Sequence, residues 1–232
     1  MKSGLFFSLL LTAAVPAAAI VATPTRAAEA ASAVDPAAKV VVDRYVAWRG
    51  GAAFEAMATV HQQGSLEAGG LKGTAERWAS RDGRQRDGYD LGAFTGSSAF
   101  GPEGAWTKTQ NIVEDMPPAT LQDNRRQLAL EFDVALRGGG GATVHRIADE
   151  PREGRTWAVL RVGFGDADTY DAFIDLASGE LLGWRVIEDR KERFLRSGDW
   201  RVVGGVRTAY LLEEIHANPA ENVTQRLTLA EV

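Results

Sequence analysis

Short apolar segments that alternate with polar residues occupy most of the chain after residue 58. Between residues 59 and 68, Val60, Leu66 and Ala68 alternate with polar side chains, and Gly69-Gly70 follows as a two-residue turn. A period of two is typical of a strand with one buried face, and a glycine pair of this kind joins two strands into a hairpin. The same pattern predicts further strands at 71–80, 84–91, 94–100, 105–109, 143–148, 156–164, 169–176, 181–188, 193–203, 206–216 and 223–232. The sequence therefore predicts a mainly β (α+β) fold with about 11 or 12 antiparallel strands.

A helix is predicted ahead of the strands. Asp35 can cap a helix that has Pro36 in its first position, and Gly50-Gly51 provides the stop. A second short helical turn is expected at 52–58, directly before the first strand. The apolar stripe of the first helix recurs at spacings near 3.6 residues and consists of Val40, Val41, Tyr45 and Trp48.

The strand pattern is interrupted between residues 111 and 141. Pro117-Pro118 precedes residues 119–136, which contain no turn residues, and the glycine run 138–141 follows. Length and stop signal favour a helix that crosses the sheet. Proline stiffens one end of this segment and glycine frees the other, so it is either a movable lid over the sheet or a fixed cover with a loose exit loop.

The N-terminus has the pattern of a secretory signal peptide over residues 1–28. Lys2 precedes an apolar stretch over 5–15, and small residues follow as far as Ala28, with Ala22 as an alternative cleavage position. The strongly apolar run is shorter than the roughly 20 residues that a membrane-spanning helix needs. We therefore expect export to the periplasm and a single mature domain over 29–232. The alternating pattern continues to Val232 without a terminal turn, which leaves open that this domain is truncated.

Composition and charge exclude several classes of protein. The chain carries 26 Lys and Arg against 31 Asp and Glu, a formal charge of −5, which argues against a nucleic-acid partner. With 45% hydrophobic and 25% charged residues it has the composition of an ordinary globular protein. Cysteine is absent, so disulfides, thiolate metal sites and a lipidated N-terminal cysteine are excluded.

No catalytic or cofactor motif is recognisable. The three histidines, His61, His145 and His216, lie on different predicted strands, and the acidic loop with Asp166, Asp168 and Asp171 lacks the pattern of a calcium loop. There is neither a Gly-x-Ser-x-Gly nucleophile motif nor the Asp-Thr/Ser-Gly triplet of aspartyl proteases. The sequence therefore predicts no enzyme, no metal and no cofactor.

The order of elements resembles that of the LolA/LolB-like periplasmic lipoprotein carriers and their relatives, which include the N-terminal modules of some exported aspartyl-protease-family proteins. The resemblance rests on local features: the helix that ends at Gly50-Gly51, the hairpin over 64–73, Trp78 before 83–86, the turn 101–104 ahead of Trp106, and the late hairpin over 175–181. It implies a strongly curved antiparallel sheet, an unclosed β-barrel, with helices that cover an apolar cavity on the concave side.

Resemblance and fold class together suggest a function. The expected function is non-enzymatic binding of a lipid or lipoprotein acyl chain, with transient contact to a membrane surface; the alternative is an accessory module of an exported aspartyl-protease-family protein whose catalytic domain lies elsewhere. A curved sheet with one apolar face must be covered by helices or by a ligand. Strand alternation selects the cavity candidates, which are Val60, Leu66, Leu71, Leu160, Val162, Phe173, Leu182, Trp184 and Leu211. A one-residue bulge would invert the face of any of these strands.

Overall fold

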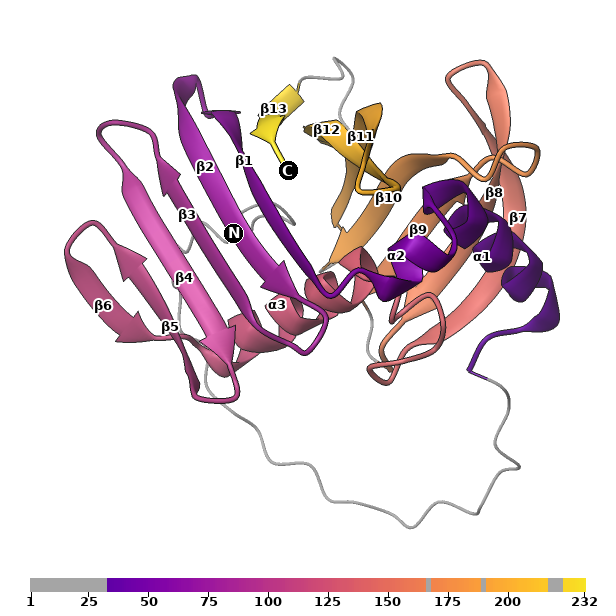
Figure 1. The fold of residues 1–232 in the computed structure, drawn as a ribbon, viewed down its shortest axis with the longest axis horizontal. Coiled ribbons are helices and arrows are strands. Elements are labelled where there is room, and N and C mark those ends of the chain that lie inside the picture. Colours follow the sequence, from indigo (N-terminus) through magenta and orange to yellow (C-terminus); the bar gives the residue numbers. More distant parts are fainter. Residues whose placement is uncertain (1–32, 166–167, 189–190, 217–222) are drawn as a thin grey trace, which may run out of the picture.

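Three helices and thirteen strands make up the described part of the chain, residues 33–165, 168–188, 191–216 and 223–232 of a computed structural model (Figure 1). The predicted signal peptide and Asp166 lie outside the described residues. The elements, in chain order, are α1 (Pro36–Arg49), α2 (Ala52–Ala56), β1 (Thr59–Ala68), β2 (Leu71–Ser80), β3 (Gln85–Asp90), β4 (Thr95–Gly101), β5 (Gly104–Thr109), β6 (Ile112–Asp115), α3 (Pro118–Glu131), β7 (Thr143–Arg152), β8 (Arg155–Gly163), β9 (Thr169–Ile174), β10 (Leu181–Glu188), β11 (Lys191–Val203), β12 (Val206–His216) and β13 (Val223–Glu231).

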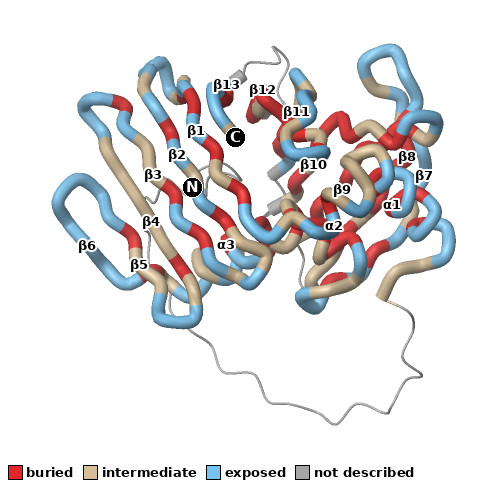
Figure 2. The backbone as a smooth tube through the Cα atoms, viewed as in Figure 1, coloured by how far each residue is buried: buried red, intermediate tan, exposed pale blue. Residues whose placement is uncertain are grey.

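All strands belong to one antiparallel sheet that does not close. Its order is β6-β5-β4-β3-β2-β1-β13-β12-β11-β10-β9-β8-β7, so the first and the last strand pair in the middle and β6 and β7 form the two edges. This confirms the predicted mainly β class with an open sheet. Along β1 to β3, buried and exposed positions alternate as the sequence predicts (Figure 2).

One strand was missed by the pattern. β6 is the edge strand that pairs with β5, and all four of its residues are exposed, Ile112 and Val113 included. Because a strand without a buried face has no alternation of apolar and polar side chains, a sequence pattern cannot reveal it. The predicted strand 143–148 is also longer in the structure, since β7 continues through a bulge between Ile147 and Glu150.

Helix α1 begins and ends where the sequence predicts. The Asp35 carboxylate accepts a hydrogen bond from the backbone N–H of Ala38, and Gly50 follows the last helical residue. The apolar stripe is rotated relative to the prediction, because Val40 is exposed. The buried face consists of Ala38, Val41, Val42, Tyr45 and Val46.

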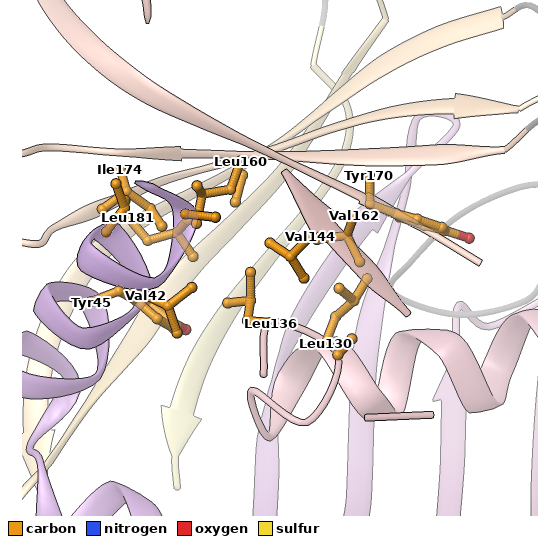
Figure 3. Packing of buried hydrophobic residues seen from close by; sticks show 14 of the residues in the cluster. Val42, Tyr45, Leu130, Leu136, Val144, Leu160, Val162, Tyr170, Ile174 and Leu181 are labelled. Carbon is orange, nitrogen blue, oxygen red and sulfur yellow. The ribbon is translucent and has the colours of Figure 1, made fainter. Parts of the chain in front are cut away.

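The main core lies between α1, the end of α3 and the inner face of β7–β10. Val42 and Tyr45 point toward Leu160, Val162, Ile174 and Leu181, and Leu130 and Leu136 approach the same cluster from the α3 side (Figure 3). A second apolar cluster on the opposite face of these strands contains Trp157, Val159, Phe173, Leu182 and Phe194. Both faces of this half of the sheet are therefore apolar.

Helix α3 is shorter than the predicted 119–136. It ends at Glu131, and Asp133 follows with a φ of +59°. The buried Asp133 carboxylate accepts a hydrogen bond from Arg137 Nε at 2.5 Å. A left-handed residue stops a helix, and this side-chain bond holds Asp133 in place. Residues 132–138 form turns that carry Leu136 into the main core.

The Asp35 cap yields a test of how α1 is fixed to the sheet. Asp35 Oδ2 also accepts a hydrogen bond from the backbone N–H of Arg146 in β7, at 2.9 Å. The hydrogen bond from Ala38, assisted by that from Arg146, lowers the pKa of Asp35 below its ordinary 3.8. A lowered carboxyl pKa means that the stabilisation is present above pH 3.8 and is lost as the pH falls through the folded-state pKa.

We expect Asp35→Ala to lower the free energy of unfolding by about 1–2 kcal/mol at pH 7, the usual cost of losing a helix cap. The deficit should shrink toward zero as the pH falls below 3.8. Urea unfolding from pH 7 downward measures it. Asp43→Ala, which removes an exposed partner of Lys39 on the same helix, is the control and should have little effect. A deficit that stays constant with pH would contradict the assigned role of the charged cap.

Candidate ligand-binding cavity

A cavity of about 130 Å³ lies on the inner face of the sheet, where the C-terminal halves of α1 and α3 approach each other. Helices form one side of it, and strands from both halves of the sheet form the other. Its lining residues are Tyr45 and Arg49 of α1, Gln127, Leu130 and Glu131 of α3, Gln62 of β1, Arg77 of β2, Leu181 and Trp184 of β10, Leu195, Ser197 and Trp200 of β11, and Thr208, Ala209 and Leu212 of β12.

One wall of the cavity is hydrocarbon. Leu181, Trp184 and Leu195 form it from the sheet side, and Leu130 faces it from α3. Leu130, Leu181 and Leu195 are buried, and the half-buried Trp184 packs against the main core. Apolar walls with a few polar groups are the usual setting for a small hydrophobic ligand.

A buried ionic group borders the opposite side. Arg77 lies between two carboxylates, with Nη2 3.2 Å from Glu131 Oε2 and Nε 3.4 Å from Asp87 Oδ1, and it donates a hydrogen bond to Gln85 Oε1 at 3.0 Å. Strand pairing places Arg77 and Asp87 directly opposite each other, whereas Glu131 comes from α3. Burial raises the pKa of Asp87, and the charge of Arg77 opposes that rise. Arg77 is thus the ionic link between the sheet and the end of α3.

The buried side of α3 is unusually polar. Asn124, Arg126 and Gln127 are all buried, next to Leu128 and Leu130. Asn124 Nδ2 lies 3.4 Å from the sulfur of Met116, and the Arg126 guanidinium lies over the ring of Phe164 at 5.2 Å. The entry of water into a polar interface costs less free energy than its entry into an apolar one, because the polar groups can hydrogen-bond to water instead.

Arg81 fastens the end of α3 to the end of α2. Its guanidinium donates to the carbonyl oxygens of Phe54 and Met57, each at 3.0 Å, and to that of Phe132 at 3.1 Å. It also lies 3.4 Å from the buried Asp133 carboxylate. One side chain therefore donates hydrogen bonds to carbonyl groups at two helix ends, where the intrahelical donors run out.

Of the nine residues predicted from strand alternation, Trp184 lines this cavity. Leu160 and Val162 lie in the main core below α1, and Phe173 and Leu182 lie in the cluster on the opposite face of the sheet. The remaining four lie in other parts of the fold.

Those four come from the strands near the middle of the sheet. Val60 belongs to the cluster that α3 covers with Leu128 and Phe132. Leu66 lies in a cluster with Tyr210, and Leu71 is 37% exposed at the hairpin end. Leu211 is half-buried on β12. These residues lie apart from the cavity, and their role in binding a ligand stays a prediction.

The polar lining was missed by a search for apolar positions. Gln62 and Arg77 occupy the same inward phase as Val60, Leu66 and Ala79, so each is a polar residue where the strand pattern calls for an apolar one. These polar residues at inward strand positions were the sequence signal that could have identified the lining. A buried polar residue in an otherwise apolar row is more informative than another buried leucine.

The histidines have structural partners. The ring of His61 stacks on that of Trp78 at 3.7 Å between centroids and lies 3.0 Å from Glu76, and His145 lies 3.5 Å from Asp35. The side chain of His216 lies outside the described part. Within the described ranges no group of three histidine or acidic residues could hold a metal ion. Likewise, in the part of the chain that the structure covers, every helix is too short or too polar to cross a bilayer.

A second, wider groove of about 560 Å³, the outer groove, runs along the ends of β2 to β5. Trp78 and Trp106 flank it, and its lining includes the turn residues 101–104. Trp78 is 51% exposed there. A bound chain would stay largely in contact with water at such a rim, whereas the central cavity lies between the helices and the sheet.

Arg81 provides a test of how α3 is held over the cavity. We expect Arg81→Met to lower the free energy of unfolding by about 2–4 kcal/mol, because it removes the donor that three carbonyl oxygens share and one of the two arginines that contact the buried Asp133 carboxylate. Chemical unfolding measures the loss. Arg84→Met is the matched control: Arg84 lies in the same turn and pairs with the exposed Asp82, so its loss should be small. Equal effects of the two substitutions would show that Arg81 does not fasten the helix ends.

Solved structures share this architecture. A putative outer membrane lipoprotein-sorting protein domain from Vibrio parahaemolyticus superposes with a TM-score of 0.54 at 10% identity, over 84% of this chain and 90% of that one. A LolA superfamily protein from Nitrosomonas europaea gives 0.56 at 9% identity, over 84% and 91%. A DUF1329 family protein from Desulfovibrio piger gives 0.54 at 10% identity, over 84% and 91%.

These likenesses show a LolA-like fold, as the order of elements predicted. At 9–10% identity they show the fold alone. The sequence matches no protein-family model. No curated protein matches it either.

Proposed function

We propose that this protein binds the acyl chain of a lipid or lipoprotein, without enzymatic chemistry, in the cavity between α1, α3 and the sheet. The observation that carries the proposal is the hydrocarbon wall of Leu130, Leu181, Trp184 and Leu195 on the covered face of an open sheet. The LolA-like fold, shared with a domain named for outer membrane lipoprotein sorting, supports the same reading.

The compartment belongs to the same proposal. The signal-peptide pattern of residues 1–28 and the absence of cysteine suit a periplasmic protein. Transient contact with a membrane surface stays a prediction. The alternative, an accessory module of an exported aspartyl-protease-family protein, gains no support from the three similar structures, none of which is named as a protease.

The cavity is smaller than a whole acyl chain, and a shift of α3 would enlarge it. A protein cavity of about 150 Å³ holds a molecule the size of benzene. The 130 Å³ found here therefore admits one end of an acyl chain but not its whole length. The polar underside of α3 and its ionic link through Glu131 permit a shift that a tight apolar seam would resist. The junction at Arg81 holds Phe132, next to Glu131 at the same end of α3, so the shift would pivot on this end of the helix.

Binding is tested by filling the cavity. Ser197 lines it from β11, so Ser197→Phe should weaken the binding of a fluorescent acyl probe by about tenfold or more, because the ring occupies the ligand's space. Ser65→Phe, the same substitution at an exposed position of β1, is the matched control and should leave the affinity unchanged. The proposal fails if the probe does not bind and mass spectrometry of natively purified protein detects no co-purified lipid.

The lid is tested separately by amide hydrogen exchange. If α3 opens to admit a chain, saturating dodecanoate should hold α3 closed and slow amide exchange across 121–136. Exchange across the buried face of α1 should stay the same. Unchanged exchange across 121–136 at saturating ligand would leave α3 a fixed cover.

A further inference from the structure

Arg49 occupies one end of the cavity and lies among aromatic rings. It is in the last turn of α1, and its Nη1 donates a hydrogen bond to the Tyr45 hydroxyl at 2.8 Å. Its guanidinium carbon lies 4.2 Å from the ring centre of Phe54 and 5.7 Å from those of Tyr45 and Trp200. The Nε–H is buried and has no hydrogen-bond acceptor.

The charge of Arg49 is not matched by a carboxylate. Among the described residues no acidic oxygen lies within 4.0 Å of its guanidinium, whereas Arg77, which lines the same cavity, is flanked by Glu131 and Asp87. Aromatic faces and the carbonyl end of α1 stabilise the cation in part. They leave its N–H groups without a strong acceptor, which is costly for a partly buried guanidinium.

The surroundings of Arg49 add further donors. The Trp200 indole N–H is also buried without an acceptor, and Trp200 lines the cavity together with the hydroxyl-bearing Ser197 and Thr208. The ring of Trp200 is held edge-on against Trp48 at 4.7 Å. The ionic lining residues are Arg49, Arg77 and Glu131, and the one carboxylate among them is engaged by Arg77. This end of the cavity thus holds one guanidinium without a carboxylate partner and is rich in donors.

We infer that the cavity takes an amphiphile with an anionic headgroup, a carboxylate or a phosphate, which Arg49 binds while the hydrocarbon wall holds the acyl chain. The inference rests on the proposed function. A guanidinium binds such oxyanions through charge-assisted and often paired hydrogen bonds. The Trp200 N–H supplies a further donor, and the nearby apolar residues Leu195 and Trp184 receive the first part of the chain.

The test compares different headgroups on the same dodecyl chain. Dodecanoate, dodecyl phosphate and dodecanol are titrated against the full chain by displacement of a fluorescent acyl probe, with inorganic phosphate as a fourth competitor. The wild type should bind the two anionic compounds about tenfold or more tightly than dodecanol, and inorganic phosphate alone should not displace the probe. Arg49→Met should abolish this preference while dodecanol binds as before, and Arg49→Lys should restore part of it.

Two further variants separate an effect on headgroup binding from an effect on folding. Arg86→Met removes an exposed arginine of the outer groove and should keep the preference. Trp200→Phe keeps a ring but deletes the N–H, and should reduce the preference about threefold or more if Arg49→Met fails to fold.

The possible outcomes distinguish the two proposals. Equal binding of all three compounds, or an unchanged preference in Arg49→Met, overturns the headgroup site and leaves acyl binding intact. Loss of the preference in Arg86→Met instead places the anion site in the outer groove and also overturns the inference. Displacement by inorganic phosphate as strong as that by dodecyl phosphate would make the ligand a free anion and overturn the amphiphile. No binding of any dodecyl compound overturns the proposed function itself.

Discussion

The inner face of one open sheet must be covered, and the chain provides few helices to cover it. Helices α1, α2 and α3 have 14, 5 and 14 residues, set against thirteen strands in the described part of the chain. An uncovered apolar face would be unstable in water. Helix α1 covers the C-terminal strands with an apolar stripe, and α3 covers the N-terminal strands with a mixed one. The cavity lies at the seam between these two covers, where neither fills the space completely.

The two covers are held by different forces. Helix α1 packs through apolar residues into the largest core, whereas α3 adds ionic contacts with Arg81 and Arg77 to the burial of Leu128 and Leu130. Buried ionic groups specify a geometry more than they add stability, because desolvation offsets much of their attraction. Because α1 is firmly packed and the buried side of α3 is polar, the cavity between them can open on the α3 side without disturbing the core under α1. That asymmetry suits the proposed binding of an acyl chain.

Local signals were sufficient for most of the fold. Glycine turns and alternation placed twelve of the strands, and Asp35-Pro36 placed the start of α1. The edge strand β6 escaped because it buries nothing. The end of α3 depends on Asp133, whose conformation is held by Arg137, four residues later, and by Arg81, which lies 52 residues earlier in the sequence and so gives no local signal.

The cavity was harder to predict, for a physical reason. Strands β8 and β9 are buried on both faces, since Arg152 and Arg185 cover Phe173 from outside with their guanidinium groups. Alternation is lost in such strands and at the start of β10, where Leu181 and Leu182 are both buried, so Phe173 and Leu182 could not be distinguished from inward residues. Arg49 lies on a helix next to a glycine stop, where an arginine is ordinary. Its lack of a carboxylate partner is visible only in three dimensions.

The central claim is that an acyl chain lies between α3 and the sheet, against Trp184. A crystal structure with an acyl ligand brominated along its chain tests this directly, because the anomalous signal of bromine marks the chain's position. The account predicts bromine sites beside Trp184, Leu195 and Leu130, with α3 displaced from its position over Arg77. Bromine found in the outer groove beside Trp78 and Trp106, with the central cavity unchanged, would contradict it.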